Sequence, residues 1–266
     1  MSVQKNIKLD STIQILPSEP TTELYASIQK SYDHFNQALF DGSLPKVIFT
    51  TQRKKNVMGY FSRERWVSIE GQRCHEIAIN PSYVASSSLI ELLQTLVHEM
   101  VHCWQDDFGK TGRRGYHNKE WADKMEFIGL MPSSTGRAGG DKTGDRMGDY
   151  PIPHGQFIHE CKRLISTGFA LPWIDRYTLK PEKSIENTFS PEIKALELDE
   201  ALAEQLTEGV NKLLGDETFL PVTQSPKGRI KSRYSCPQCQ LNVWGKPELD
   251  LSCNVCHKVL TELSGE

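Results

Sequence analysis

The sequence lacks a long hydrophobic run and carries no large excess of charge of either sign. None of its 266 residues belongs to a run of the roughly 18 apolar side chains that a membrane-spanning helix needs, so we expect no membrane span and no membrane partner. Residues 1–10 are polar and lack the apolar centre of a secretion signal. A net charge of −3 and a pI of about 6.3 exclude a uniformly basic protein that coats nucleic acid.

Cysteine is also scarce, and its distribution argues against a disulfide framework. Four of the seven cysteines form two CxxC pairs, Cys236 with Cys239 and Cys253 with Cys256. An odd number remains outside these pairs, namely Cys74, Cys103 and Cys161. Reduced thiols together with metal-binding pairs are typical of an intracellular protein, which we expect to be cytoplasmic or, in a bacterium, associated with the nucleoid.

The most informative motif is His98-Glu99-Met100-Val101-His102, an HExxH sequence. On a helix, residues i and i+4 lie one above the other, so His98 and His102 can bind one metal ion. Glu99 projects from the neighbouring position toward the water that the metal would activate. The motif predicts zinc-assisted hydrolysis with Glu99 as the general base. A surface helix that merely carries two histidines is the alternative.

The residues around this motif predict an internal helix. Ser88 is a candidate N-cap, and Glu91 three residues later completes a capping box. Apolar residues recur at helical spacing: Leu89, Leu92, Leu93, Leu96, Met100 and Trp104. Val97 and Val101 make another face apolar as well, so we expect the helix to be buried. Buried histidines need partners, and a metal ion supplies one.

A catalytic zinc site normally has three protein ligands and one open position, so the HExxH helix needs a third ligand. His117 is the preferred candidate, because it opens a second helical pattern whose apolar face should pack inward. The apolar residues of that pattern are Trp121, Met125 and Ile128. Glu120 is the alternative ligand, since a carboxylate also binds zinc. His154 and His159 lie in a less regular segment, where we expect ordinary polar or packing histidines.

The two CxxC pairs predict a second metal site of a different kind. Each pair forms a tight turn that directs two thiolates at one tetrahedral ion, so we expect Cys236, Cys239, Cys253 and Cys256 to bind a structural zinc in a zinc ribbon. Redox-active dithiols are the alternative, although no thioredoxin-like sequence surrounds either pair. We interpret His257 as a neighbour of this site rather than a ligand. The expected cofactors are therefore two zinc ions, one catalytic and one structural.

Longer segments around the HExxH helix resemble a known family. HEMVHCW and GYHNKEWADKMEFIGL are similar to segments of the SprT-like metalloproteases, the group that includes the eukaryotic Spartan proteases. FDGSLP, GYF and EIAINP, which precede the helix, resemble the same family, and many members also end in a zinc ribbon. The resemblance covers about residues 20–150 and returns at the C-terminus. It implies that His98, His102 and His117 bind the catalytic zinc and that Glu99 is the catalytic base.

The pattern of segments predicts an α+β, zincin-like metalloprotease domain. Apolar spacing predicts a helix over 21–40, and β-like runs at 47–50, at 59–61 with 66–69, and at 76–79 predict a small antiparallel sheet ahead of the HExxH helix and the ligand helix. We expect a flexible N-terminus over 1–20, a protease domain over 21–190 with its core at 21–150, an amphipathic helix and linker over 191–226, and the zinc ribbon over 227–266.

The sequence allows a structural prediction for each of two segments that follow the helix near His117. Residues 133–148 contain five glycines and form either a surface loop or a flap that lines the substrate site beside the zinc. Apolar residues between Phe157 and Ile165 predict one short helix.

Basic residues precede the ribbon at alternating positions. Lys227, Arg229, Lys231 and Arg233 would share one face of an extended strand. Together with Tyr234 and Trp244 they could contact phosphates and stack on bases, which makes DNA an expected partner. A solvated strand is the alternative interpretation.

The sequence therefore predicts a zinc-dependent endopeptidase of the SprT-like type that acts as a monomer on protein substrates. Tyr116 and Tyr150 are candidate donors to the oxyanion. By resemblance to Spartan-type enzymes, the substrates would be proteins bound or crosslinked to DNA. Two alternatives stay open: a DNA-binding or transcription-associated accessory factor with weak protease activity, and a general peptidase that acts without DNA.

Overall fold

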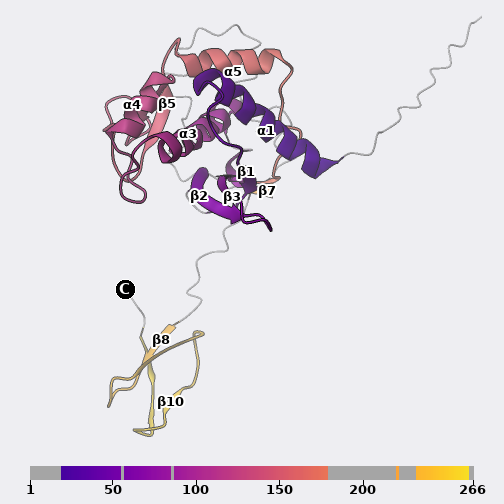
Figure 1. The fold of residues 1–266 in the computed structure, drawn as a ribbon. Helices are drawn as coiled ribbons and strands as arrows, with labels where there is room; N and C mark the ends of the chain where they lie inside the picture. The colour runs from indigo at the N-terminus through magenta and orange to yellow at the C-terminus, as the bar shows by residue number, and fades with distance from the viewer. Residues whose placement is uncertain (1–18, 55–56, 85–86, 179–219, 222–231, 264–266) are drawn as a thin grey trace, which may run out of the picture. The chain divides into compact units, whose positions relative to one another are not determined.

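The computed structural model describes residues 19–54, 57–84, 87–178, 220–221 and 232–263 (Figure 1). The chain divides between Pro221 and Val222 into two compact units, each of which is described by itself. Most of the expected flexible N-terminus and nearly all of the expected helix and linker over 191–226 lie outside the described residues. None of the described helices is both long enough and apolar enough to span a membrane.

The first unit begins with helix α1 (Pro20–Leu39), which confirms the predicted helix to within one residue at each end. Pro20 suits the first turn, where its missing N–H needs no partner. The buried face of α1 carries Ile28, Tyr32, Phe35 and Leu39. The Asn36 side chain both donates to and accepts from the Leu44 backbone at 3.1 Å, which fixes the turn after the helix.

A three-stranded sheet follows in the order β1-β3-β2. It consists of β1 (Ile48–Thr51), β2 (Gly59–Val67) and β3 (Arg73–Ile79). β2 and β3 pair antiparallel, but β1 pairs parallel to β3, so the expectation of a purely antiparallel sheet is wrong. β1 and β2 run in opposite directions on the two edges of β3, so β1 does not pair with the strand that follows it in the sequence. Alternation of apolar residues predicts strands but does not specify their partners.

Strand β2 lies at an edge of this sheet, and its outer side has no strand partner among the described residues. It is one continuous strand of nine residues, where the sequence predicts two separate runs. Its register against β3 shifts between Ser62 and Trp66, and Glu64 takes a positive φ of 42° there. Such a bulge bends a strand and redirects its side chains.

Helix α3 (Leu89–Phe108) is the centre of the first unit, and it packs on the sheet, on α1 and on α4 (Figure 1). The predicted capping box is confirmed, because the Ser88 hydroxyl accepts from the Glu91 backbone and the Glu91 carboxylate accepts from the Ser88 backbone. Leu93, Leu96, Val97 and Met100 are almost fully buried, as the apolar pattern predicts, whereas Leu89, Leu92 and Trp104 of that pattern are only partly buried. The helix that carries the HExxH motif is therefore internal.

Helix α4 (Lys119–Phe127) begins after the third histidine rather than at it. Asn118 is the N-cap, and its side chain accepts from the Trp121 backbone at 3.1 Å. The sequence predicts that the helix opens at His117, but it begins two residues later. The reason is that an asparagine N-cap requires extended backbone just before the first turn. The expected inward face is confirmed by the full burial of Trp121 and Met125.

The remaining elements of the first unit are short apart from α5 (Gln156–Ser166), which confirms the helix predicted near Phe157 and packs against α1. The others are α2 (Pro81–Val84), the antiparallel pair β4 (Leu130–Ser133) and β5 (Gly148–Pro151), and the parallel pair β6 (Tyr177–Thr178) and β7 (Leu220–Pro221).

The second unit is a small β structure with two sheets. One has the order β12-β8-β9 and contains β8 (Ser232–Ser235), β9 (Asn242–Gly245) and β12 (Thr261–Leu263). The other pairs β10 (Ser252–Cys253) with β11 (Lys258–Val259). Among the described residues of this unit, the buried core consists of Tyr234, Cys236, Cys253 and Leu260. So few buried side chains rarely stabilise a fold without a metal or a disulfide.

Candidate metal centres

Three histidines from two segments meet in the first unit. His98 and His102 lie on one face of α3, and His117 reaches them from the segment before α4. One side-chain nitrogen from each lies within 4.8 Å of the others, and Nε2 of His102 is 3.1 Å from Nε2 of His117. Two nitrogens bound to one tetrahedral zinc lie about 3.3 Å apart. The buried Trp121 ring packs against all three imidazoles, with centroid distances from 4.4 to 5.5 Å.

Two of the three imidazoles are held by their other ring nitrogen. Nδ1 of His98 is 2.8 Å from Oδ2 of Asp149, and Nδ1 of His117 is 3.1 Å from the backbone oxygen of Gly144. A carboxylate and a carbonyl can only accept, so both Nδ1 atoms carry the proton. Nε2 of His98 and of His117 is therefore left with a lone pair, which is what a metal ligand requires.

The electrostatics of this cluster fit a divalent cation. Burial, reinforced by the neighbouring histidines, lowers the pKa of His102 well below its usual value, and burial with the His98 charge lowers the pKa of His117 to about 4. These two imidazoles are thus neutral near pH 7. Burial also disfavours a charged His98, but the hydrogen bond that His98 donates to Asp149 and the charge of Glu99 raise its pKa overall. Oδ1 of Asp149 is buried without a hydrogen-bond partner among the described residues, and a nearby cation would compensate this anion.

Glu99 lies beside the histidines and is also buried. Burial raises the pKa of its carboxyl group, and the charge of His98 together with a hydrogen bond from the Phe61 backbone partly opposes that rise. A carboxylate with a raised pKa is better able to hold a proton for part of a reaction cycle. This is the property that a general base needs when it must later act as an acid.

The histidines and Glu99 line a cleft of about 1650 Å³. Its other walls come from β2, from residues 111–117, and from the glycine-rich segment, of which residues 134–137 and 145–148 face the cleft. Tyr116 and Tyr150, the candidate oxyanion donors, also line it. The cleft thus brings the expected substrate-lining loop next to the expected zinc ligands.

The other candidate ligands on the sequence lie elsewhere. Glu120 accepts from the Lys110 backbone at 2.6 Å and from the Gln105 side chain at 2.9 Å, so it is held by the loop after α3 and does not join the histidines. His154 is exposed, and His159 pairs with its neighbour Glu160 at 3.1 Å.

A further His–Cys–Asp group, His75 with Cys103 and Asp107, has the proximity of a metal site but not its chemistry. Nδ1 of His75 accepts from the Glu64 backbone at 2.9 Å, so the proton is on Nε2, which faces the Asp107 carboxylate at 3.2 Å. Neither nitrogen then offers a free lone pair. Burial and the charge of Asp107 raise the pKa of Cys103 to about 12, so its sulfur is a thiol. The group instead links the β2 bulge to α3.

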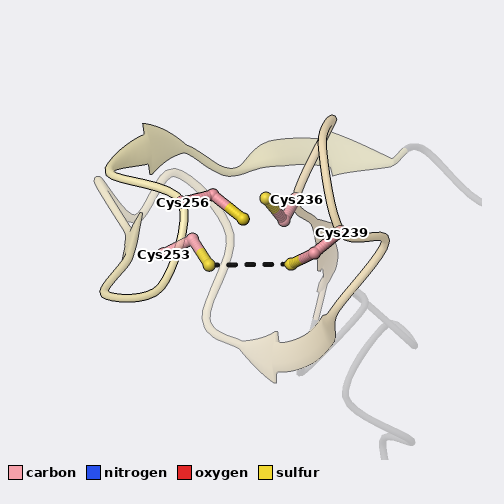
Figure 2. A group of neighbouring side chains, drawn as sticks. All are labelled: Cys236, Cys239, Cys253 and Cys256. Carbon is pink, nitrogen blue, oxygen red and sulfur yellow. Dashed lines mark hydrogen bonds between the residues drawn. The ribbon is translucent and has the colours of Figure 1, made fainter.

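In the second unit the four paired cysteines face one point (Figure 2). Their sulfurs lie within 4.8 Å of one another, and Sγ of Cys239 is 3.7 Å from Sγ of Cys253. Backbone hydrogen bonds from Cys239 and Gln238 help to lower the pKa of Cys236 to about 7, which favours the thiolate. Four converging sulfurs fit a tetrahedral zinc ion.

The two cysteine turns have the same backbone form. The residue after each pair, Gln240 or His257, has a positive φ and donates its N–H to the carbonyl of the first cysteine, at 2.9 and 2.8 Å. This explains why His257 follows the site without belonging to it: its role is to close the turn.

The residues that the sequence predicts to contact nucleic acid differ in where the structure places them. Lys227, Arg229 and Lys231 lie outside the described residues. Arg233 is exposed on β8 and lies directly across from Trp244 on β9, whose ring is 64% exposed. The expectation that Tyr234 contacts nucleic acid is wrong: alternation along β8 turns it inward, where it is 1% exposed, and its hydroxyl bonds to the backbone of Lys246 and Leu249.

Comparison with known proteins agrees with this geometry. A family model described as SprT-like matches residues 28–137, which include all three histidines. A relative from Salmonella typhimurium, named "Uncharacterized protein in mucB 3'region", is 40% identical over 58 residues, which is 22% of this chain and 78% of the relative. The chain belongs to the SprT-like family. No solved structure matches it.

Membership of the SprT-like family has consequences for fold and chemistry. It implies a zincin-like fold for the α+β first unit and supports a metalloprotease-type function with protein substrates. It also agrees with zinc as the metal for the three-histidine group, and the four cysteines of the second unit fit a zinc ribbon.

Proposed function

We propose that the protein is a zinc-dependent endopeptidase whose catalytic residues lie in the α3 cleft. The convergence of three imidazoles beside the buried Glu99 is the observation that carries this proposal. His98, His102 and His117 would hold the ion and leave one position open toward the cleft. When bound, zinc supplies Lewis-acid polarisation of the scissile carbonyl and of water.

Glu99 carries the proton transfers. Its carboxylate takes a proton from the attacking water and later gives it to the nitrogen of the leaving amine. Burial raises the pKa of this carboxyl group, which helps it to hold the proton between the two transfers. Tyr116 and Tyr150 are the proposed donors to the oxyanion, because both hydroxyl-bearing side chains line the same cleft.

Strand β2 gives the cleft a shape that suits an extended peptide. Residues 59–63 of this edge strand line the same cleft as Glu99, so an extended substrate could pair with the side of β2 that has no partner strand among the described residues. Gly59 permits the close approach of β2 to α3. A Cβ added there would lie 2.8 Å from Cγ2 of Thr95 and 3.0 Å from the Ala78 carbonyl oxygen.

We further propose that the substrates are proteins bound or crosslinked to DNA, so that in a bacterial cell the protein acts at the nucleoid. The charge of the cleft supports an anionic partner, although the whole chain has a net charge of −3. Seven basic residues line it against five carboxylates. The carboxylates that have basic partners are Asp106 with Arg63, Asp145 with Arg113, and Asp149 with His98. Arg65, Arg114, Arg137 and Arg146 are exposed and have no acidic partner among the described residues.

The zinc ribbon is the proposed DNA-recruiting module. Arg233 and Trp244 form an exposed cross-strand pair in which a cation can meet a phosphate and a ring can stack on a base. We propose residues 227–266 as this module and 21–190 as the protease domain, with a helix and linker over 191–226 between them.

A defined DNA–protein crosslink tests this function. The zinc-loaded full chain and Glu99→Gln are each incubated with the crosslink and with the same protein free of DNA. We expect cleavage only by the wild type and much faster cleavage of the crosslinked form. Equal cleavage of both forms would indicate a general peptidase. Absence of cleavage, with zinc bound at both centres, would favour a DNA-binding accessory factor.

A further inference from the structure

One short stretch of chain, Gly144–Asp149, contacts two of the three candidate zinc ligands. The carbonyl oxygen of Gly144 accepts from the backbone N–H of His117 at 2.8 Å and from its Nδ1 at 3.1 Å. The Gly144 N–H returns a bond to the His117 carbonyl at 3.1 Å. His117 belongs to no helix, so this isolated bridge fixes both its backbone and its ring.

The other end of the stretch is fixed to α3. Asp149 is 8% exposed and lies in β5, which pairs with β4. Its Oδ2 faces Nδ1 of His98 at 2.8 Å, while its backbone oxygen accepts from the Gln94 side chain at 2.8 Å. Gln94 lies one helical turn before His98, so these two contacts fix the position of Asp149 along the axis of α3.

We propose that Gly144–Asp149 orients the zinc ligands, and that Asp149 is the positioning residue that keeps the proton of His98 on Nδ1 and its Nε2 lone pair toward the metal. This inference rests on the proposed function. A charged acceptor also makes the imidazole a better donor to a metal, and such partners typically contribute about 10–100-fold to metal affinity. The unpartnered Oδ1 of Asp149 fits this role, because the charge of a bound ion would stabilise a carboxylate that hydrogen bonds leave half satisfied.

The same stretch lines the substrate cleft, so the shape of the cleft and the orientation of the candidate ligands depend on one segment. Residues 145–149 face the cleft, and Gly144 and Asp149 hold the ligands. Displacement of this stretch would therefore change both the shape of the cleft and the orientation of two imidazoles. If the ordered form of this stretch binds the metal more tightly, then metal binding stabilises the ordered form by the same free energy.

The test is metal affinity of the full chain, compared between Asp149→Asn and Asp145→Asn. Asp145 is the matched control, because it lies in the same stretch but is exposed and pairs with Arg113. Cobalt reports the two centres separately, since only a cysteine site gives a thiolate charge-transfer band. We expect Asp149→Asn to weaken zinc at the histidine centre by about 10–100-fold and Asp145→Asn to change it less than about twofold.

Nitrogen NMR of the zinc-loaded wild type gives a second readout that does not depend on the stability of any variant. We expect His98 to bind through Nε2 with a proton on Nδ1. An unchanged affinity in Asp149→Asn, or coordination of His98 through Nδ1, would overturn the inference. A wild type that binds metal only at the cysteines would instead remove the proposed function itself, so the two failures are distinguishable.

Discussion

The histidine centre and the cysteine centre differ in how they are assembled from the chain. The four cysteines come from two turns of one small unit, and each turn closes on its own backbone. The histidines come from α3 and from the segment before α4, and their rings depend on a third segment at Gly144–Asp149. The cysteine centre has four candidate ligands, whereas the histidine centre has three and opens into a cleft. A closed site is suited to stability and an open site to chemistry.

The largest effect should follow loss of a ribbon cysteine. The core of the second unit is small, and structural zinc contributes about 10–16 kcal/mol to such modules. We expect Cys239→Ser to abolish zinc binding in this unit and the hydrogen-exchange protection of β8 and β9, while α3 stays protected. Cys74→Ser, which changes a cysteine outside both centres, is the control. Protection of β8 that survives in Cys239→Ser would mean that the ribbon folds without metal.

Glu99→Gln tests the histidine centre. Whereas Cys239→Ser should remove structure, this variant should remove activity and leave the structure intact. Glutamine keeps the size of the side chain but cannot take the proton, which should lower the cleavage rate by about 10²–10⁴-fold. Zinc content and the thermal midpoint should match those of the wild type. Should the variant lose zinc as well, Glu99 would be needed for the site itself rather than for proton transfer.

Gly59→Ala tests whether the approach of β2 to α3 shapes the cleft. The added Cβ would come within 3.0 Å of the Ala78 backbone and closer still to Thr95, so β2 must shift. We expect a loss of about 1–3 kcal/mol in the free energy of unfolding, together with weaker peptide cleavage. Gly112→Ala is the matched control, since it also lines the cleft but its Cβ would have an ordinary contact at 3.4 Å. Equal stability of the two variants would contradict the proposed role of Gly59.

Trp244→Ala tests the ribbon as a DNA-binding surface. Loss of one stacking ring should weaken single-stranded DNA binding by about 5–150-fold, equivalent to about 1–3 kcal/mol. Fluorescence anisotropy at fixed salt measures the affinity, and Val259→Ala changes another exposed apolar side chain of the same unit as a control. Identical affinity in Trp244→Ala and the wild type would remove this ring from the interface.

The smallest effect should come from the cleft arginines. Arg114→Gln and Arg146→Gln remove charges without acidic partners among the described residues, so stability should change little. If DNA phosphates lie near the cleft, each variant should reduce the salt dependence of DNA binding by about one ion and weaken binding modestly. Unchanged salt dependence in both variants would mean that neither Arg114 nor Arg146 contacts DNA.

Local sequence patterns predict much of this molecule because the interactions behind them span a few residues. The capping box of Ser88 and Glu91 and the buried face of α3 follow from helical geometry alone. The four cysteines that meet in the second unit are recognisable from their spacing. The structure also brings together His98, His102 and His117, which the sequence reasoning singled out, although their role in binding zinc and that of Glu99 in catalysis stay predictions.

Other features depend on contacts between distant segments. The sequence does not distinguish Asp149, because it lies 51 positions from His98 and is one of many acidic residues. The sequence predicts an exposed Tyr234, because aromatic residues beside basic ones often stack on bases, whereas the side chain is 1% exposed and its hydroxyl donates to the Lys246 backbone.

The family, the HExxH helix with its cap and the two cysteine turns are recognisable from the sequence alone, since each depends on residues close together in the chain. The parallel pairing of β1 with β3, the position of His117 before α4, and the contacts of Gly144 and Asp149 with the histidines emerge only in the folded chain. The two groups of features differ in the range of the interactions that set them. Hydrogen bonds within a turn follow from neighbouring residues, whereas strand partners and ligand orientation are set when distant segments are packed around one core.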